Sequence, residues 1–294
     1  PDLLEWLAAD FVENGWKFKR LHKLIMSSKT YRMGTNHPKI KKLKNIDPEN
    51  RLLAYREPRR LSAEELRDSM LVSSGELNRE IGGLPIMPEI NMEVALQPRM
   101  IQFSLAPAYQ PSKWQKERNR RTIYAYRVRG QPDPFLELFN QPNPNDSCEE
   151  RVSESVSPQA FSLLNSSLMN DRAIALALRI EKEFSDIHLQ VKRAVQLAYG
   201  RIPNPEEWER LKKYLIKMET YHHSSKPEPC KYPTSITRSL VEENTGDTFE
   251  YEEILPVFKD YQRDKKAHEL APETRALSDL CLVLFNSNEY IYVY

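Results

Sequence analysis

The stretch SAEELRDSMLVSSG at residues 62–75 decides the fold class. Ser62 followed by Glu65 forms a capping box, in which each side chain satisfies a backbone N–H group at a helix start. Leu66 and Met70 then recur at helical spacing, and the closing glycine suits the left-handed backbone that ends many helices. The stretch therefore predicts a helix with one apolar face, which points to a chain built around helices.

The residues before this stretch continue the helical pattern. Apolar residues between Leu3 and Val12 recur at helical spacing, and Gly15 follows them as a helix end. A second helix is expected through Leu21 and Ile25, and the Lys-rich residues 36–45 are expected to form a loop. Together these segments predict an N-terminal helical half over about residues 1–80.

The C-terminal side also predicts helices, over about residues 134–294. Ser157-Pro158 provides an N-cap and a proline at the first helical position, and Asn204-Pro205 repeats that pattern. Further helices are expected through Leu178, through Val195 up to Gly200, and through Leu277 to Phe285. A polar insert of low apolar content lies at about residues 221–272.

The middle of the chain, at about residues 82–130, departs from the helical pattern. Prolines at positions 85, 88, 98, 107 and 111 exclude a long helix, so an irregular wrap is expected. The alternation in residues 121–129 predicts one strand, with Tyr124 and Tyr126 on one face. The fold class is therefore mainly α: a multi-helix globular domain with a minor β element and a long Pro-rich irregular segment.

Composition limits the classes of partner. The 43 Lys and Arg residues nearly cancel the 42 Asp and Glu residues, so no overall field attracts nucleic acid, and charge recognition must be local. No apolar run is long enough to span a membrane. Because the chain starts without an initiator Met or a signal sequence, it is expected to be the C-terminal part of a larger protein whose upstream region is missing.

The cysteines leave two interpretations open. Cys148 lies in a polar loop and is a candidate reactive thiol or a disulfide partner of Cys230, with a small loop anchor as the alternative. Cys281 falls on the apolar face of the last predicted helix and is expected in the core. The adjacent pair His222-His223 lacks a spacing that converges ligands with Cys230, so no metal site is predicted.

Two dense groups of arginines are the main candidates for recognition, at positions 56–60 and 118–129. Guanidinium groups suit carboxylate, sulfate or phosphate, so these arginines predict either structural networks with carboxylates or an anion-binding groove. Asp133, Glu137 and Asp146 are candidate acid and base groups. Glu64, Arg67 and Asp68 are expected to form ion pairs within one helix.

Five segments in order resemble one family: DPENRLLAYREPRRLSAEELRDSMLVSSGELNREIGG from Asp47, RRTIYAYRVR from Arg120, residues 139–165, LAYGRIPNPEEWERL from Leu197, and DLCLVLFNSNEYIYV at the end. In this order the chain resembles the planctomycete-type domain of unknown function 1553, also called the Planctomycete cytochrome-associated C-terminal domain. The resemblance covers essentially the whole chain and implies one family domain over residues 1–294.

Several charged and core positions match the family pattern, and Asn140 stands where the family commonly has aspartate. They indicate a buried polar network or an anion-binding site, with no catalytic residue assigned. The candidate residues are Arg59, Arg60, Glu64, Arg67, Asp68, Arg120, Arg121, Arg127, Arg151, Gln159 and Asn165. Members of the family are typically exported bacterial proteins, so the resemblance implies a periplasmic or cell-envelope location.

Three functions follow from these observations. The leading hypothesis is a non-catalytic interaction or scaffold module that docks against other domains of its own chain, and against an acidic protein or an anionic glycan. The second is an enzyme or enzyme subunit acting on anionic, sulfated polysaccharide. The third is an accessory module in electron transfer; it rests on the family context, which places haem c in an upstream domain, with no cofactor expected in this segment.

Overall fold

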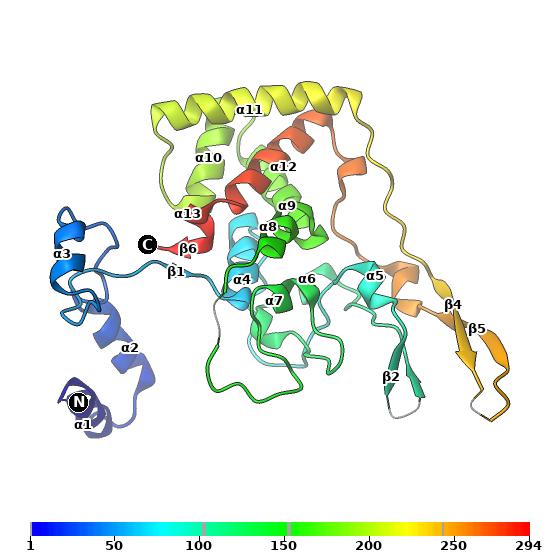
Figure 1. The fold of residues 1–294 in the computed structure, drawn as a ribbon. Coiled ribbons are helices and arrows are strands. Elements are labelled where there is room, and N and C mark those ends of the chain that lie inside the picture. The colour runs from blue at the N-terminus through cyan, green and yellow to red at the C-terminus, as the bar shows by residue number, and fades with distance from the viewer. Residues whose placement is uncertain (1, 102–103, 152–153, 243) are drawn as a thin grey trace. The chain divides into compact units, whose positions relative to one another are not determined.

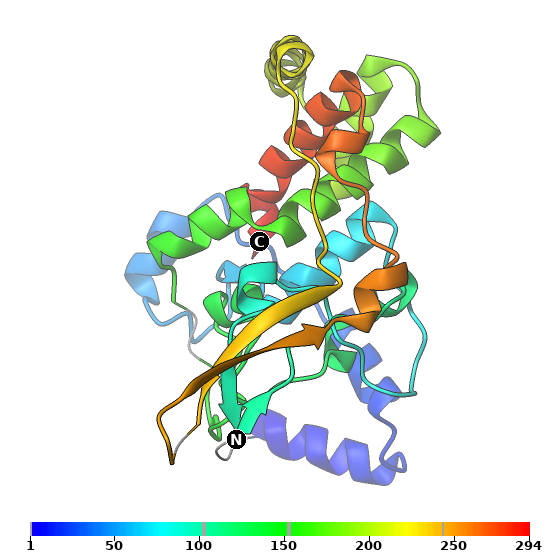
Figure 2. The same cartoon turned by 90° about the vertical axis from the view of Figure 1, so that its right-hand side faces the viewer.

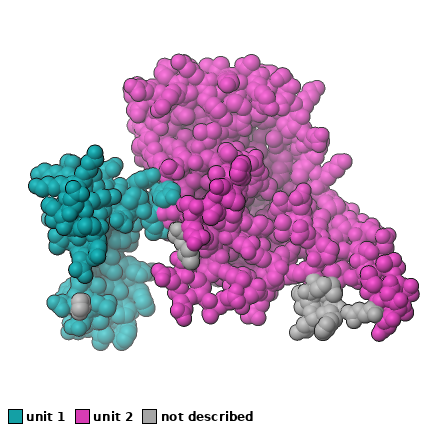
Figure 3. Space-filling view, viewed as in Figure 1, with its two compact units in different colours: residues 1–59, 292–294 teal, residues 60–291 magenta. Residues whose placement is uncertain are grey.

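The structure is a computed structural model that describes residues 2–101, 104–151, 154–242 and 244–294. Within these ranges the chain forms two compact units. Unit 1 comprises residues 1–59 and 292–294, and unit 2 comprises residues 60–291 (Figure 3). The boundary after Arg59 assigns the helix that begins at Ala63 to unit 2, together with the C-terminal helices.

Unit 1 contains helices α1 (Asp2–Glu13), α2 (Phe18–Ser27) and α3 (Ile40–Ile46). The first two helices confirm the predictions, whereas the loop expected at residues 36–45 is wrong. Ile40 and Leu43 lie three residues apart among lysines, which are good helix formers, so the segment forms α3. The short strands β1 (Arg59–Arg60) and β6 (Tyr292–Val293) lie where the chain passes between the units.

Unit 2 is built mainly from helices, which run from α4 to α13 (Figure 1). The longer ones are α4 (Ala63–Ser74), α8 (Ser157–Asn165), α9 (Ser167–Glu183), α10 (Ile187–Tyr199), α11 (Pro205–Ser224) and α12 (Pro272–Phe285), and α13 (Asn288–Ile291) closes the unit. Helix α9 packs against α4 and α12, and α11 packs along α10 and α12. Met169, Leu176 and Leu280 are fully buried between these helices. The mainly α fold class is thus confirmed.

The predicted helix ends are largely confirmed. Ser62 and Glu65 form the capping box of α4, and Gly75 ends that helix with a left-handed backbone at φ 79°. Asn204 caps α11 in the same way, and Gly200 ends α10 at φ 72°. One position is shifted, because α8 begins at Ser157 itself, with the preceding Val156 as its N-cap residue.

The Pro-rich wrap is irregular, as predicted, and holds only short elements. These are α5 (Met92–Ala95), β2 (Arg99–Ile101), β3 (Ser104–Ala106) and α6 (Gln115–Arg118), followed by the 3₁₀ turn described below. Strands β2 and β3 pair antiparallel. The prolines confine the helices to single turns, so this segment depends on side chains for its backbone contacts.

The strand predicted at residues 121–129 is wrong. The structure has a 3₁₀ helix, η1 (Thr122–Tyr124), followed by residues with two isolated bridges, between Ile86 and Ala125 and between Val128 and Gln131. The reason is tertiary: the Asp68 carboxylate accepts hydrogen bonds from the backbone N–H and the hydroxyl of Thr122. The Asp68 side chain and the main chain of Ile86, which bonds to Tyr124 and Tyr126, satisfy this backbone without a longer strand pairing, and Tyr126 is exposed instead of sharing a buried face.

The polar insert at residues 221–272 contains the main β element of the described residues, which was not predicted there. Strands β4 (Ser235–Val241) and β5 (Thr248–Ile254) form an antiparallel hairpin that extends away from the helices of unit 2 (Figures 1 and 2). Two 3₁₀ turns follow, η2 (Pro256–Asp260) and η3 (Ala267–Glu269). The turn residues Asn244-Thr245-Gly246-Asp247 between two alternating runs were the available signal.

Candidate functional site

Unit 2 encloses a cavity of about 610 Å³ that lies among α4, α7 (Pro134–Leu138), α8 and α9. One part of its lining is apolar and includes Leu71, Phe135 and Leu138. The other part carries the charged residues Arg67, Glu89, Arg118, Asp133, Asp171, Arg172 and Asp264. The volume falls in the range of small-molecule sites, so this cavity is the candidate site.

Arg67, a predicted site residue, forms one wall of the cavity and is only 3 % exposed. Its guanidinium donates to the carbonyl of Arg118 at 2.6 Å, to the carbonyl of Arg120 at 3.1 Å and to the Thr122 hydroxyl at 3.0 Å. Asp68 lies 3.8 Å away. Arg67 therefore holds the turn at η1 in place.

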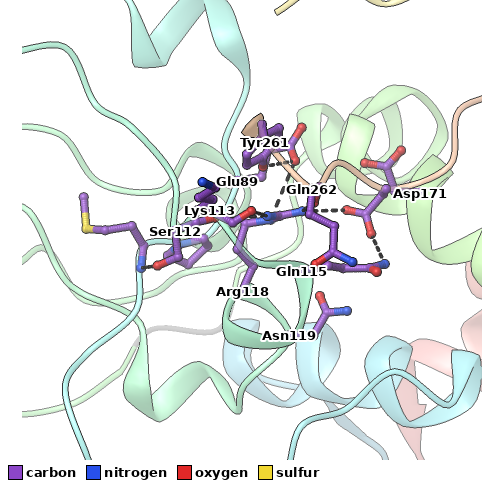
Figure 4. A network of polar contacts seen from close by, with 12 residues as sticks. Glu89, Ser112, Lys113, Gln115, Arg118, Asn119, Asp171, Tyr261 and Gln262 are labelled. Atoms are coloured by element: carbon purple, nitrogen blue, oxygen red, sulfur yellow. Dashed lines mark hydrogen bonds and ion pairs between the residues drawn. The ribbon is translucent and has the colours of Figure 1, made fainter. Parts of the chain in front are cut away.

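Arg118 also lines the cavity, is 2 % exposed and acts in the same way (Figure 4). It donates to the carbonyls of Ser112 at 3.0 Å, of Lys113 at 3.1 Å and of Gln262 at 2.7 Å. Its guanidinium also lies over the Tyr261 ring at 4.4 Å. One side chain thereby joins the Pro-rich wrap to the segment that follows η2.

Arg172 of α9 lies in a group of buried charges. Its Nη2 lies 2.7 Å from Asp264 Oδ1, and its Nη1 donates to Glu76. Gln115 adds hydrogen bonds to both carboxylates, at 2.5 Å to Asp264 and 2.9 Å to Glu76. Burial alone would raise the pKa of Asp264, but the charges of Arg172 and Arg118 hold it below its usual range.

Asp171 faces Lys266, whose ammonium donates to both carboxylate oxygens at 2.9 and 2.8 Å. Burial is the largest influence on this carboxyl, and the charges of Asp264 and Glu89 act in the same direction. Lys266 opposes them, and the result raises the pKa of Asp171 to about 7. The Glu89 carboxylate also accepts hydrogen bonds from Tyr232 at 2.8 Å and Tyr261 at 2.5 Å.

Asp133 lines the cavity as the N-cap of α7, where Oδ1 accepts from the backbone of Phe135 at 2.9 Å and of Leu136 at 3.2 Å. Burial raises the pKa of its carboxyl against these hydrogen bonds. Glu137 and Asp146 are exposed and do not line the cavity. The structure therefore does not bring the three proposed proton-transfer carboxylates together.

A second polar cluster lies around Gln159 at the start of α8. Arg60 donates to Gln159 Oε1 at 2.8 Å, to the Glu154 carbonyl at 2.6 Å and to Asn140 Oδ1. Gln159 in turn donates to the Leu138 carbonyl at 2.9 Å. The amide oxygen of Asn140 thus takes the acceptor role that an aspartate would otherwise have at this position.

Glu64 pairs with Arg151 at 2.9 Å, where α4 faces the loop before α8. Gln141 donates to the same carboxylate at 3.3 Å. Burial would raise the pKa of Glu64, but the hydrogen bond and charge of Arg151 lower it overall. The ion pair predicted between Glu64 and Arg67 within one helix is thus replaced by a pair over a long sequence separation.

The remaining predicted residues are dispersed. Arg120 donates to the Leu84 carbonyl at 2.9 Å and lies over the Tyr124 ring at 4.0 Å. Arg127 donates to the Pro142 carbonyl, and Asn165 lines the cavity while donating to the Phe161 carbonyl at 3.0 Å. Arg121 is exposed, 3.9 Å from Asp68, and Arg59 belongs to unit 1.

The cysteines and histidines do not form a common site. Cys148 and Cys230 are exposed free thiols, and Cys281 is buried in the core, as predicted for it. His222 bonds to Asp279 at 2.7 Å. In the described ranges, one group of side chains has potential metal-ligand atoms within 4.8 Å of one another. It consists of Glu219, His223 and Glu273, and Cys230 is not part of it.

Sequence reasoning missed four charged residues that line the cavity, Glu89, Asp171, Arg172 and Asp264, together with Glu76 and Lys266, which pair with them. A signal was present for two of them, because Asp171 and Arg172 interrupt an otherwise apolar stretch of α9 that includes Met169 and Ala173. Charges are rarely buried without partners, so this interruption indicates a paired interior site. Asp264 and Lys266 lie in the polar insert, where charged residues carry no such signal.

The family comparison agrees with the resemblance seen in the sequence. The model of the PSD1 family, described as a protein of unknown function (DUF1553), matches residues 1–215, and the chain belongs to this family. No curated protein and no solved structure is significantly similar to the chain. In the part of the chain that the structure describes, no helix is both long and apolar enough to cross a membrane.

Proposed function

We propose that this domain is a non-catalytic interaction module of an exported bacterial protein, which docks against other domains of that protein. One observation carries the proposal: the buried arginines of the candidate site are engaged inside the molecule. Arg67 and Arg118 of the cavity donate to main-chain carbonyls of irregular segments, and Arg120, which is buried outside the cavity lining, does the same. These arginines therefore cross-link the irregular segments of the domain.

The energetic cost of redirecting these arginines favours the structural role. A buried carbonyl that loses its donor costs about 1–3 kcal/mol, and Arg118 alone satisfies three carbonyls. An anionic ligand that recruited this guanidinium would leave those carbonyls without a partner. The cavity wall is therefore suited to holding loops in place and poorly suited to anion capture.

The β4–β5 hairpin is the element that such a scaffold presents to a partner. Its base is fixed, because Arg238 pairs with Glu253 at 2.8 Å and donates to the Leu96 carbonyl at 2.6 Å. Beyond this base, Phe249 and Tyr251 are 48 % and 38 % exposed, with ring centroids 6.5 Å apart. A two-stranded hairpin also has free edges, and exposed edges with aromatic side chains favour docking by strand addition.

The test measures association of this chain with the rest of the native protein, expressed separately, by isothermal titration calorimetry. Phe249→Ser combined with Tyr251→Ser should weaken binding at least about tenfold, as loss of an aromatic anchor does. Thr248→Ala combined with Glu252→Ala alters exposed positions of the same strand and serves as the control. Absence of association with the unmodified chain, or equal loss in both double variants, would refute the proposal.

A second candidate function rests on the cavity carboxyls. Asp133 and Asp171 both have raised pKa values within a cavity of ligand size, which is a common property of acid–base sites. We infer from this an alternative function, in which the domain hydrolyses an anionic polysaccharide. A reducing-end assay over a panel of such polysaccharides tests it. Turnover that is lost in Asp133→Asn would establish this alternative over the non-catalytic one.

A further inference from the structure

Residues 16–46 of unit 1 form the most unbalanced stretch of charge in the chain. They contain ten Lys and Arg residues and no Asp or Glu, although the whole chain is nearly neutral. Arg20 pairs with Asp10 of α1. Lys19, Lys23 and Arg32, by contrast, have no carboxylate partner within the described residues. This concentration of unneutralised positive charge indicates an anionic partner outside the described residues.

Three of these cations come together at one place on α2. A groove on unit 1 is lined by Lys19, His22, Lys23, Met26, Ser27 and Arg32. Lys19 and Lys23 are one helical turn apart, so their ammonium groups project from the same face of α2. Arg32 joins them from the turn that follows the helix. The groove therefore combines positive charge with the apolar side chain of Met26.

Large apolar side chains are also exposed on α1 and α2 and in the turn between them. Trp16 and Phe18 are each 65 % exposed, and Met26 is 56 % exposed. On α1, Leu4 is 72 % exposed and Trp6 is 55 % exposed. Unit 1 contains no buried residue in α1, α2 or α3 as far as the structure describes it. Unit 1 thus exposes a large amount of apolar surface to water, and such surfaces usually mark interaction sites.

The two helices that carry these groups pack against each other. Phe11 of α1 packs edge-on against Trp16 and Phe18, with ring centroids 5.3 and 5.0 Å apart. The ion pair between Asp10 and Arg20 adds a polar connection between the helices. The apolar and basic groups are therefore held together on one helical hairpin.

We propose that unit 1 binds the surface of an anionic lipid bilayer, with the cations on lipid phosphates and the exposed aromatic and aliphatic side chains in the interface. Basic amphipathic helices with exposed tryptophan bind lipid surfaces in this way. A soluble anionic polymer would neutralise the lysines but leave Phe18 and Met26 in water. The combination of charge and apolar exposure hence selects lipid, and the inference is independent of the hairpin function proposed for unit 2.

The test is co-sedimentation of the whole chain with vesicles of phosphatidylcholine alone or with 30 mol % phosphatidylglycerol, a composition chosen to supply anionic headgroups. Binding should require the anionic lipid and weaken as salt rises. The triple variant Lys19→Gln, Lys23→Gln, Arg32→Gln should bind on the order of 100-fold more weakly, because each cation near an anionic surface contributes about fivefold. Met26→Gln should weaken binding without changing its salt dependence.

A matched control removes three exposed lysines of unit 2, in the variant Lys213→Gln, Lys217→Gln, Lys231→Gln. It has the same net charge as the unit 1 variant and should bind like the unmodified chain. If both triple variants lost the same amount of vesicle binding, binding would depend on net charge alone, and the proposal would be overturned. Absence of vesicle binding, equal binding to neutral vesicles, or binding to heparin or single-stranded DNA without binding to vesicles would also overturn it.

Discussion

Arg67 illustrates, at the scale of one residue, how this protein uses buried charge. Its three hydrogen bonds reach segments more than 50 positions away along the chain. Replacing Arg67 with Met should lower the free energy of unfolding by about 3 kcal/mol, because two carbonyls and a hydroxyl lose their donor. Urea denaturation followed by circular dichroism measures the change.

Arg121 provides the control for that experiment. It lies close in the sequence to the groups that Arg67 binds, but its side chain is 56 % exposed. Arg121→Met should change the unfolding free energy by no more than about 0.5 kcal/mol. If Arg67→Met were as mild as Arg121→Met, the cross-linking role assigned to the buried arginines would be wrong.

Asp171 makes the stability depend on pH. Because the pKa of this carboxyl is raised to about 7 in the folded protein, it should hold its proton to a higher pH than in the unfolded chain, where the ordinary value is 3.8. The folded state therefore binds more protons between these values, and its stability falls as pH rises through this window. This group should lower the free energy of unfolding by about 2 kcal/mol between pH 5 and 7.

The variant Asp171→Asn isolates this contribution, because it cannot ionise. Denaturation of both proteins at several pH values gives the difference in unfolding free energy. The unmodified protein should lose stability relative to Asp171→Asn as the pH rises from 5 to 7. A constant difference over this range would mean that Lys266 keeps Asp171 ionised throughout.

At the scale of elements, two helix ends of the same type differ in their surroundings. Gly75 and Gly200 both have positive φ, at 79° and 72°. A Cβ at position 75 would lie 3.3 Å from the Arg179 side chain, whereas position 200 is open. Arg179 also donates to the Ser73 carbonyl at 2.8 Å, so its displacement would break a hydrogen bond.

Alanine at the two positions should therefore have unequal effects. Gly200→Ala should lower the stability by about 1 kcal/mol, because a residue with a Cβ is strained in a left-handed backbone. Gly75→Ala should cost about 2 kcal/mol, because the contact with Arg179 is added. Thermal unfolding of both variants measures the two losses of stability. Equal losses would show that the Arg179 side chain moves aside without destabilising the protein.

At the scale of the whole molecule, the two units differ in their cores. Unit 2 buries large apolar side chains such as Leu66, Ile180 and Phe285, and most residues of its core lie at less than 5 % exposure. In unit 1, Tyr55 is the one buried hydrophobic residue of the described part. A chain folds independently when it encloses its own core, so unit 2 meets that condition and unit 1 does not.

A truncated chain of residues 60–291 tests this division. It should fold and unfold in one cooperative transition, with near-ultraviolet circular dichroism that reports packed aromatic side chains. Loss of that signal together with retained helix content would show that unit 2 needs residues of unit 1 to pack. The folded truncation should also fail to bind anionic vesicles, since it lacks α2.

The sequence alone determined most of the long helices and where most of them end. Capping boxes at Ser62 and Asn204, and left-handed glycines at positions 75 and 200, act within a few residues, so local chemistry predicts them. The fold class followed from such local patterns, and the family followed from the resemblance of five segments. The Pro-rich wrap was predictable for the same reason, since each proline removes a backbone donor.

Only the tertiary structure decided the conformation of residues 121–129 and the composition of the cavity. The backbone of Thr122 is satisfied by Asp68, 54 positions away, and this contact overrides the strand pattern. Lys266 likewise reaches Asp171 over 95 positions. Partners at such separations are chosen by packing, and the local sequence carries no record of them, so the charged core of this protein is a property of its fold.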